Sequence, residues 1–466
     1  LIADSAHHRI VVARLDGEVQ AVIGDGEPGL RDGDWSEARF RSPQGMALLA
    51  DRLLVADTEN HAIREIDFAT KTVRTVAGTG TQRRRPPVMR MGPALQTELS
   101  SPWDLCVVGD WVYIAMAGCH QIWRMDAALT RIGPYAGNAR EDIVDGPLLP
   151  PSPYALGFAS FAQPSGLATD GEWLFVADSE GSSIRAVPLQ PRGEVRTIVG
   201  TSRLLVSRLF TFGDRDGPPD QVLLQHPIGL CYAEGFLYVA DTYNNKIKRI
   251  DPRKGVTVTV AGDGQAGQTD DPPRFDEPAG ISSAGSLLFV ADTNNHTIRV
   301  LQLQPTVKVT TLTLKGLEPP ERVEKKSSYF NDQMSFQRQP VVKLRPASVI
   351  KLRIAFDFPA GFGLNPNVPT DIVIQPLRNQ EAEPADQQQL LRVSPGEAPL
   401  EVSLTDLGSN VTALRIVCTY YWCEKSGRGL CRIGTVGWMV PLQWTDDGND
   451  TIVIQHRVTG GPSQEG

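Results

Sequence analysis

The chain has 466 residues, a formal net charge of −8, 41% hydrophobic residues and 21% charged residues. This length predicts two or more domains, the composition is that of a folded protein and not of a disordered one, and the negative charge argues against a surface that coats nucleic acid. The 43 glycines and 35 prolines indicate many turns and favour β structure over long helices. No apolar run approaches the roughly 18 to 20 residues that a membrane helix needs.

A short pattern occurs six times in the first 314 residues. In chain order its copies read LIADSAHHRIVV, LVADTENHAIRE, IAMAGCHQIWRM, FVADSEGSSIRA, YVADTYNNKIKR and FVADTNNHTIRV. Apolar residues lead into an aspartate, a polar turn follows, and an isoleucine opens a second alternating strand six residues after the aspartate. A third strand then tends to end in glycine, as in TVRTVAGTG.

A second signal precedes five of the six copies. It reads SPQGMAL, SPWDLCV, QPSGLAT, HPIGLCY and EPAGISS. Proline fixes φ, and the glycine in four of these segments permits close backbone approach. Each unit thus holds four short strands, and such a sheet, with no helix to cover it, must bury its faces against copies of itself. The sequence therefore predicts an all-β fold, a six-bladed β-propeller over residues 1–314.

The first blade of this propeller is predicted to be incomplete. Asp4 follows only three residues, so the leading strand that lines the channel of a propeller is missing from the first unit. We expect residues upstream of Leu1 to supply that strand.

The third copy departs from the pattern. Met116 replaces the aspartate, and Trp123 stands where four other copies have arginine or lysine. We expect Gly118 to help this turn form by relaxing the backbone constraint. Met116, His120 and Trp123 form a candidate docking surface for another domain, because aromatic and sulfur-bearing side chains suit such contacts. The alternative is that this blade packs differently against its long insertion.

The polar residues of the repeat are predicted to serve the turns. A short carboxylate at the aspartate position can accept hydrogen bonds from backbone N–H groups of its turn. Four histidines share one repeat position, which separates them around the ring: His8, His61, His120 and His296. Zinc ligands lie about 2 Å from the ion, so no common metal centre is expected. The run GDGEPG spells GxGxxG, but no helix follows it, which excludes a dinucleotide site.

Strand patterns return after the propeller. Residues 315–339 are polar and charged with a proline pair and are predicted to be a linker. Residues 340–459 contain VIKLRIAFDF, TDIVIQPL and ALRIVCTYYWC, which predict a β-sandwich. Residues 460–466 are predicted to be a disordered tail.

The six cysteines fall into two groups. Cys106 and Cys231 occupy the same position in two repeats, so they lie on different blades and are predicted to be buried and unbonded. Cys423 and Cys431 flank the glycine-rich turn EKSGRGL, and a hairpin there would bring the two thiols within disulfide distance.

The Cys423–Cys431 pair has three interpretations. It is a structural staple, or it is an accessible pair that exchanges with a thioredoxin-like domain. The third interpretation is a zinc site that includes Cys418, although this spacing is poor for zinc and Cys418 should point to the opposite side of a regular strand.

The runs TENHAIR, TNNHTIR and TYNNKIK resemble the signature of NHL-repeat proteins, and the match covers Leu1 to about Leu314. More narrowly, IAMAGCHQIW together with GFASFAQPSGLA resembles the family of NHL-repeat-containing protein two and its bacterial and plant relatives. That resemblance implies an N-terminal thioredoxin-like domain, a propeller and a small C-terminal β-domain. This chain would be the second and third parts, and any thiol–disulfide oxidoreductase activity would reside in the first.

Three functions are compatible with these features. The leading hypothesis is an interaction scaffold that binds the thioredoxin-like domain in cis and a further protein partner of unknown identity. The first alternative is a propeller enzyme of the metal-dependent lyase or lactonase type, which needs converging His, Asp or Glu side chains. The second is RNA binding, for which Arg83–Arg85 and Arg90 are the clustered candidates.

The remaining expectations are negative or weakly determined. We predict no cofactor, no resident metal and no membrane contact, and no residue is assigned a catalytic role. The unpaired cysteines of the propeller favour a reducing cytoplasm.

Overall fold

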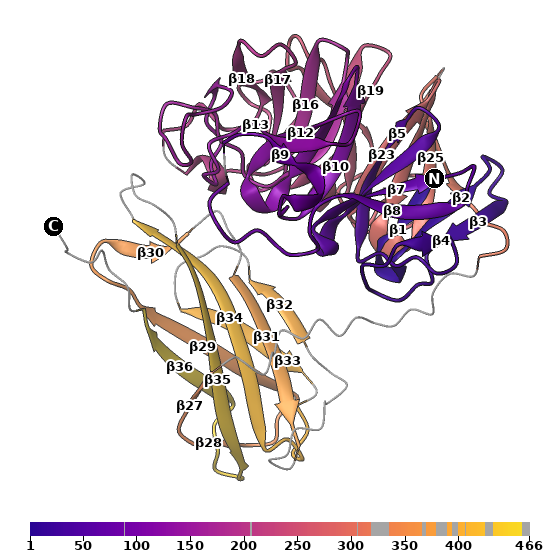
Figure 1. Ribbon diagram of the computed structural model, residues 1–466. Coiled ribbons are helices and arrows are strands. Elements are labelled where there is room, and N and C mark those ends of the chain that lie inside the picture. Colours follow the sequence, from indigo (N-terminus) through magenta and orange to yellow (C-terminus); the bar gives the residue numbers. More distant parts are fainter. Residues whose placement is uncertain are drawn as a thin grey trace. The chain divides into compact units, whose positions relative to one another are not determined.

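The computed structural model describes residues 1–87, 89–205, 207–304, 306–317, 335–365, 370–378, 389–393, 399–405, 407–424 and 432–458 (Figure 1). The chain divides into two compact units, Leu1–Glu321 and Arg322–Gly466. Over the described ranges, no helix has the length and apolar character needed to span a bilayer. Parts of three predicted segments lie outside the described residues. They are most of the linker, the turn between Cys423 and Cys431 after its first residue together with Cys431 itself, and the whole tail.

The described residues of the first unit form six antiparallel sheets in chain order, one from each repeat. The strands of the first three sheets are β1 (Ile2–Asp4), β2 (Arg9–Ala13) and β3 (Val19–Ile23); β4 (Gly33–Asp34), β5 (Pro43–Leu49), β6 (Arg52–Asp57), β7 (Ala62–Asp67) and β8 (Thr72–Ala77); β9 (Gly92–Pro93), β10 (Pro102–Val108), β11 (Trp111–Met116), β12 (Gln121–Asp126) and β13 (Arg131–Ala136).

The strands of the next three sheets are β14 (Gly146–Pro147), β15 (Pro164–Thr169), β16 (Trp173–Asp178), β17 (Ser183–Pro188) and β18 (Glu194–Val199); β19 (Pro227–Ala233), β20 (Phe236–Asp241), β21 (Lys246–Ile250) and β22 (Thr257–Ala261); β23 (Pro278–Ala284), β24 (Leu287–Asp292), β25 (Thr297–Gln302) and β26 (Lys308–Leu312). Short 3₁₀ helices occupy turns and loops: η1 (Ser5–His7), η2 (Thr58–Asn60), η3 (Ala94–Gln96), η4 (Ala117–Cys119), η5 (Arg208–Phe210), η6 (Thr242–Asn244) and η7 (Thr293–Asn295).

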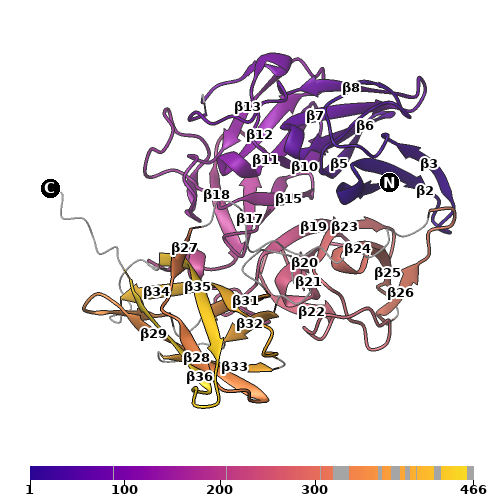
Figure 2. The ribbon, with the colours of Figure 1, turned by 90° about the horizontal axis from the view of Figure 1, so that it is seen from below.

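The leading strands of successive sheets contact one another in the order β5, β10, β15, β19, β23. Figure 2 shows these strands toward the middle of the unit, with β8, β13, β22 and β26 toward its outside. The first sheet consists of β1, β2 and β3 and has no strand equivalent to β5. The chain after β26 reaches this sheet, where the Lys315 N–H donates to the carbonyl of Gly17 at 2.8 Å. The all-β propeller fold predicted from the repeats is confirmed.

At most points where the leading strands meet, a glycine permits close backbone contact. A Cβ atom on Gly229 would lie 2.0 Å from the carbonyl oxygen of Ala279, so no larger residue fits. In β10 the equivalent residue is Asp104. Its Oδ1 lies against Gly45, and its Oδ2 accepts the Leu167 N–H at 2.8 Å. Asp104 therefore links the second, third and fourth sheets, and burial raises its pKa to about 7.

A buried ion pair closes the turn after the second strand of most sheets. In the second sheet Asp57 and Arg64 are both 0% exposed, and Nη1 of Arg64 donates to Oδ2 of Asp57 at 2.9 Å. Oδ1 of Asp57 accepts the Arg41 N–H at 2.7 Å, and Oδ2 also accepts Nδ2 of Asn60 at 2.8 Å. The expectation that the aspartate bonds to the backbone of its own turn is wrong, because that turn has no such side-chain bond. The carboxylate instead binds the segment that enters the leading strand.

The arginine of this pair also reaches the loop that precedes its sheet. Nη2 of Arg64 donates to Oδ1 of Asp32 at 2.8 Å and to the carbonyl of Arg31 at 2.7 Å. Three other sheets repeat the arrangement of turn aspartate, buried cation and loop aspartate: Asp178, Arg185 and Asp145; Asp241, Lys248 and Asp216; Asp292, Arg299 and Asp270. A buried charge is stable only when it is paired with an opposite charge in this way.

The third sheet replaces the whole set with apolar residues. Met116, Cys119 and Trp123 stand in place of Asp57, Asn60 and Arg64. Met91, which precedes Gly92 as Asp32 precedes Gly33, stands in place of the loop aspartate. Met116 is 0% and Trp123 1% exposed, and both belong to one apolar cluster with Cys119. The polar atom of Trp123 is satisfied, since Nε1 donates to Oε1 of Gln121 at 3.0 Å. Each of these substitutions is compatible with the sheet because the others remove the charges and polar groups that it would otherwise leave without a partner.

The second unit is a β-sandwich, as predicted. One sheet contains β27 (Phe336–Arg338), β28 (Val342–Leu344), β30 (Phe362–Leu364), β31 (Thr370–Leu377), β32 (Gln389–Val393), β34 (Ala413–Glu424) and β35 (Arg432–Trp444); the other contains β29 (Val349–Asp357), β33 (Leu400–Thr405) and β36 (Thr451–Arg457). Along β29 the burial alternates, which places Ile350, Leu352 and Ile354 in the core. Across that core they meet residues such as Ile416 and Trp438.

We predict that Met116→Asp alone destabilises the propeller by about 3–5 kcal/mol, because it buries one carboxylate beside Trp123 and Cys119 with no cation to pair it. The combined change Met91→Asp, Met116→Asp, Cys119→Asn and Trp123→Arg should recover part of this loss, since it recreates the set found in the second sheet. Urea unfolding followed by circular dichroism measures both. A Met116→Asp variant as stable as the parent chain would contradict this explanation of the third sheet.

Candidate functional site

The prediction that Met116, His120 and Trp123 form a docking surface is wrong. Met116 and Trp123 lie inside the sheet, and only His120 is half-buried at the surface. The physical reason is the coupled replacement of the buried ion pair, which turns these positions into core. The alternative that this blade packs differently agrees with the apolar cluster of the third sheet. The left-handed residue of this turn is His120, with φ 53°, and not Gly118, which instead has a packing role, because a Cβ atom there would lie 2.4 Å from Oγ of Ser100.

Of the predicted Cys423–Cys431 pair, only Cys423 lies among the described residues. Cys423 is disulfide-bonded, which leaves it no thiolate for zinc, whereas Cys431 lies outside the described residues, so both the staple and the exchangeable pair stay as interpretations. Cys418 is a free thiol, 0% exposed, within the sandwich core. Burial, reinforced by nearby Asp371, raises its pKa to about 12.

The histidines of the repeat link neighbouring sheets. Nδ1 of His61 accepts the Ser101 N–H at 3.0 Å, and His8 and His120 accept the equivalent N–H of the next sheet at 3.1 and 3.3 Å. Each donor precedes the proline of a leading strand. The turn role that the sequence predicted is correct, since His61 has φ 49° at the end of η2, but the inter-sheet bond was missed. Within the described residues, no group of three or more His, Cys, Asp or Glu side chains could hold a metal.

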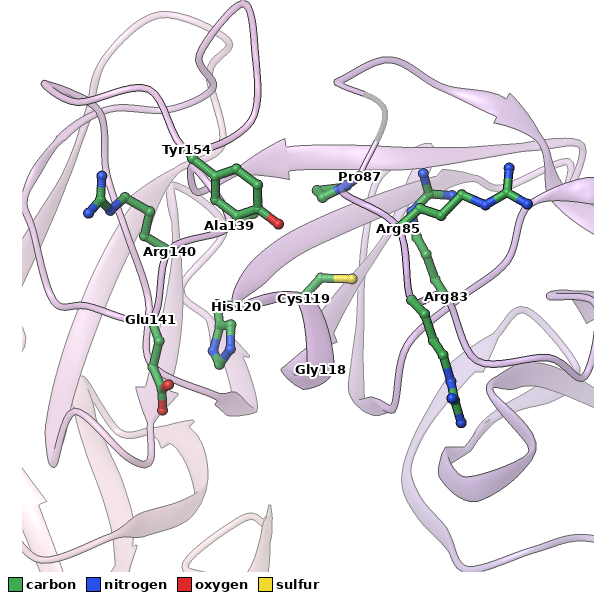
Figure 3. Close-up of a pocket in the computed structure, with 11 residues that line it drawn as sticks. Arg83, Arg85, Pro87, Gly118, Cys119, His120, Ala139, Arg140, Glu141 and Tyr154 are labelled. Atoms are coloured by element: carbon green, nitrogen blue, oxygen red, sulfur yellow. The ribbon is translucent and has the colours of Figure 1, made fainter. Parts of the chain in front are cut away.

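A pocket lies at the η4 turn of the third sheet. It has a volume of about 680 Å³, and three segments line it: the loop before β9, the turn itself and the loop after β13 (Figure 3). The lining residues are Arg83, Arg84, Arg85, Pro87, Gly118, Cys119, His120, Ala139, Arg140, Glu141 and Tyr154. The sequence showed Arg83–Arg85 as a basic run, but it gave no signal that Arg140 and Tyr154 would complete a pocket.

The pocket is strongly basic. Among the described residues that line it, four carry guanidinium groups and one, Glu141, is acidic. Among the described residues no carboxylate forms an ion pair with Arg83, Arg84, Arg85 or Arg140, and the buried Nε of Arg83 has no hydrogen-bond partner. The arrangement can bind an anion, whereas no nucleophile activated by a neighbouring base is present in this lining.

Two titratable groups line the floor of this pocket. Burial raises the pKa of the Cys119 thiol to about 11, although Arg83 opposes the shift. Burial lowers the pKa of His120, and Glu141 and Glu180 oppose that shift. At neutral pH the floor therefore carries a neutral thiol and a neutral imidazole, so the positive charge of the pocket comes from its arginines.

The free thiols should react slowly in the folded chain. Burial raises the pKa of each one to between about 11 and 12, and the four are Cys106, Cys119, Cys231 and Cys418. We predict labelling by Ellman's reagent at pH 8 at least about 100-fold slower than in denaturant, because the reactive thiolate is scarce and covered. Mass spectrometry after timed labelling assigns each site. Labelling of Cys119 at the rate of an exposed thiol would show that this turn opens.

The inter-sheet histidine bonds should weaken in acid. Nδ1 of His61 accepts a hydrogen bond, which protonation would remove, and burial lowers the pKa of His61 in the folded chain. As pH falls below the unfolded value of about 6.5, the unfolded chain takes up the proton first, so the free energy of unfolding declines.

The chain supplies a matched control for this prediction, because Asn245 makes the same bond to the Glu277 N–H at 2.8 Å. Between pH 7.5 and pH 5 the free energy of unfolding should fall less in His61→Asn than in the parent chain. Equal losses, measured by urea unfolding at the two pH values, would exclude His61 as a contributor.

No model of a protein family matches the chain. The chain is 36% identical over 482 residues to the protein SUPPRESSOR OF QUENCHING 1, chloroplastic, of Arabidopsis thaliana, which covers 98% of the chain and 43% of that protein. It is 37% identical to human NHL repeat-containing protein 2 over 79% of the chain and 54% of that protein, and 42% identical to the Bos taurus protein over 65% and 45%. The chain thus spans about half the length of the curated relatives it matches.

Solved structures show weaker likeness. The crystal structure of a nidogen/laminin complex matches with 13% identity and a TM-score of 0.40, over 58% of this chain and 80% of that one. A streptogramin B lyase matches with 11% identity and a TM-score of 0.36, over 59% and 69%. At these values no functional conclusion follows from either structure.

Proposed function

Since the chain is an NHL-repeat protein, homologous to NHL repeat-containing protein 2 and SUPPRESSOR OF QUENCHING 1, we propose that it acts as an interaction scaffold within a longer protein. Its partner in cis would be the thioredoxin-like domain that the family resemblance implies. The scaffold would hold that domain and a protein substrate together, while the domain carries out thiol–disulfide exchange.

The observation that carries this proposal is the extent of the homology. One alignment covers 98% of this chain, and therefore both of its units, but only 43% of the plant relative. The propeller and the sandwich thus occur together inside a longer protein. A scaffold for another domain requires that the propeller and the sandwich lie in the same protein as that domain, and the longer plant relative has room for one.

The chemistry of the thiols supports a scaffold role over a reactive one. The four free thiols of the described residues have strongly raised pKa values, so little thiolate forms at neutral pH. Cys423 is already bonded. The described thiols would therefore supply little attacking thiolate, which the proposed thioredoxin-like domain would provide.

The alternatives receive less support from the geometry. A metal-dependent lyase or lactonase needs converging ligands, whereas the repeat histidines are bound singly to successive sheets. RNA binding needs an extended basic face, whereas the arginines Arg83–Arg85 and Arg140 line one pocket of a chain with net charge −8.

The proposal is tested by titrating the thioredoxin-like domain of human NHL repeat-containing protein 2 into this chain by calorimetry. Tethering supplies an effective concentration near the millimolar range, so the titration should extend to about 1 mM. We expect saturable binding, and no reduction of insulin disulfides by this chain alone in the presence of dithiothreitol above background. Absence of binding, or turnover of insulin by this chain alone, would contradict the proposal.

A further inference from the structure

The arginine pocket has two opposed walls and a neutral floor. Arg83–Arg85 lie on one wall, in the loop between β8 and β9, and Arg140 lies on the other, after β13. Figure 3 shows His120 and Cys119 between them and Tyr154 on the wall of Arg140. Tyr154 is 48% exposed, so its ring is available to a ligand. The pocket therefore offers positive charge on both sides and an aromatic surface on one.

These guanidinium groups lack the partners that nearby arginines have. Arg208 pairs with Asp142, their Nη2 and Oδ2 atoms 2.6 Å apart, and Arg41 pairs with Glu59 at 3.1 Å. In the pocket, the guanidinium of Arg83 donates to the carbonyl of Pro86, and its buried Nε has no partner among the described residues. Guanidinium groups form their strongest hydrogen bonds with carboxylate or phosphate oxygens. The unfilled bonding capacity points to an anionic ligand.

The shape of the pocket favours an extended ligand over a compact one. In Figure 3 the side chains of Arg83, Arg85 and Arg140 point in different directions and do not converge on one point. A single phosphate would meet one of these groups, whereas a chain with several separated carboxylates could meet them in turn. The volume of about 680 Å³ is large enough for an organic ligand of several groups.

We propose that the pocket binds an acidic peptide segment of a partner protein. Its carboxylates pair with Arg83–Arg85 and Arg140, and Tyr154 packs against its apolar atoms. The local positive charge on a chain with net charge −8 attracts an acidic segment to this pocket. The acidic peptide would belong to the protein partner of the scaffold, so this proposal rests on the proposed function.

The test uses a fluorescein-labelled peptide of alternating glutamate, aspartate and serine, with fluorescence anisotropy as the readout. Arg84→Glu/Arg85→Glu should weaken binding at least tenfold, and Arg140→Glu on the opposite wall should weaken it as well. These residues are exposed, so the variants should keep the circular dichroism spectrum and melting temperature of the parent chain.

The matched control is Arg192→Glu/Arg253→Glu. Both residues are exposed and lie outside the pocket, and the double change alters the net charge equally. This control should leave binding within twofold of the parent chain. Binding should also weaken from low to physiological salt, because screening shortens the range of the attraction.

Three outcomes would overturn the proposal. Equal weakening by the control would mean that only overall charge matters. Displacement of the peptide by millimolar inorganic phosphate would identify a phosphate site, and tighter binding of an RNA oligomer, lost in the same variants, would identify a nucleic-acid site. Failure of the thioredoxin-like domain to bind, with the peptide still bound at the pocket, would reject the proposed cis partner and leave the peptide site standing.

Discussion

The buried pair of carboxylate and cation is the interaction on which the propeller depends. Removing two charges from water is costly, and only complete pairing offsets that cost. In the second sheet Arg64 joins the turn at Asp57 to the loop at Asp32, so one side chain fixes both ends of a repeat. Because loss of a single partner leaves an uncompensated buried charge, a fully buried aspartate and its cation are expected to change together, whereas Asp4 of the first sheet, which is partly exposed, is kept beside Val11 and pairs with Arg9. The apolar set of the third sheet is such a change.

The third sheet, in which apolar residues replace the ion pair, is also the sheet at which the candidate pocket lies. The loop before β9 runs from residue 78 to residue 91; the equivalent loops run from 24 to 32 and from 137 to 145, and the segment that ends at Asp216 begins at residue 200. In the loop before β9, Met91 stands in place of the loop aspartate, and among its described residues no ion pair holds the loop to the sheet. That loop carries Arg83–Arg85. The basic pocket thus lies at a sheet that lacks the buried pair of carboxylate and cation.

The fold was largely predictable, because strand period and the proline–glycine signal are local properties of the chain. The burial of Met116 and Trp123 was not predicted, because residues beside a polar turn are usually exposed. The signal for it was present, since the spacing of Met116, Cys119 and Trp123 matches that of Asp57, Asn60 and Arg64. The inter-sheet bond of His61 depends on how two sheets meet, which no local pattern records. Arg140 and Tyr154 reach the pocket only through the packing of successive sheets.

A double-mutant cycle at Asp57 and Arg64 tests the central claim most directly. The free energy of unfolding is measured for Asp57→Ala, Arg64→Ala and the double variant. If the pair acts as a unit, each single change costs about 3–5 kcal/mol and the double change costs far less than their sum, with a coupling of about 2 kcal/mol or more. Additive costs, within about 0.5 kcal/mol, would contradict the account.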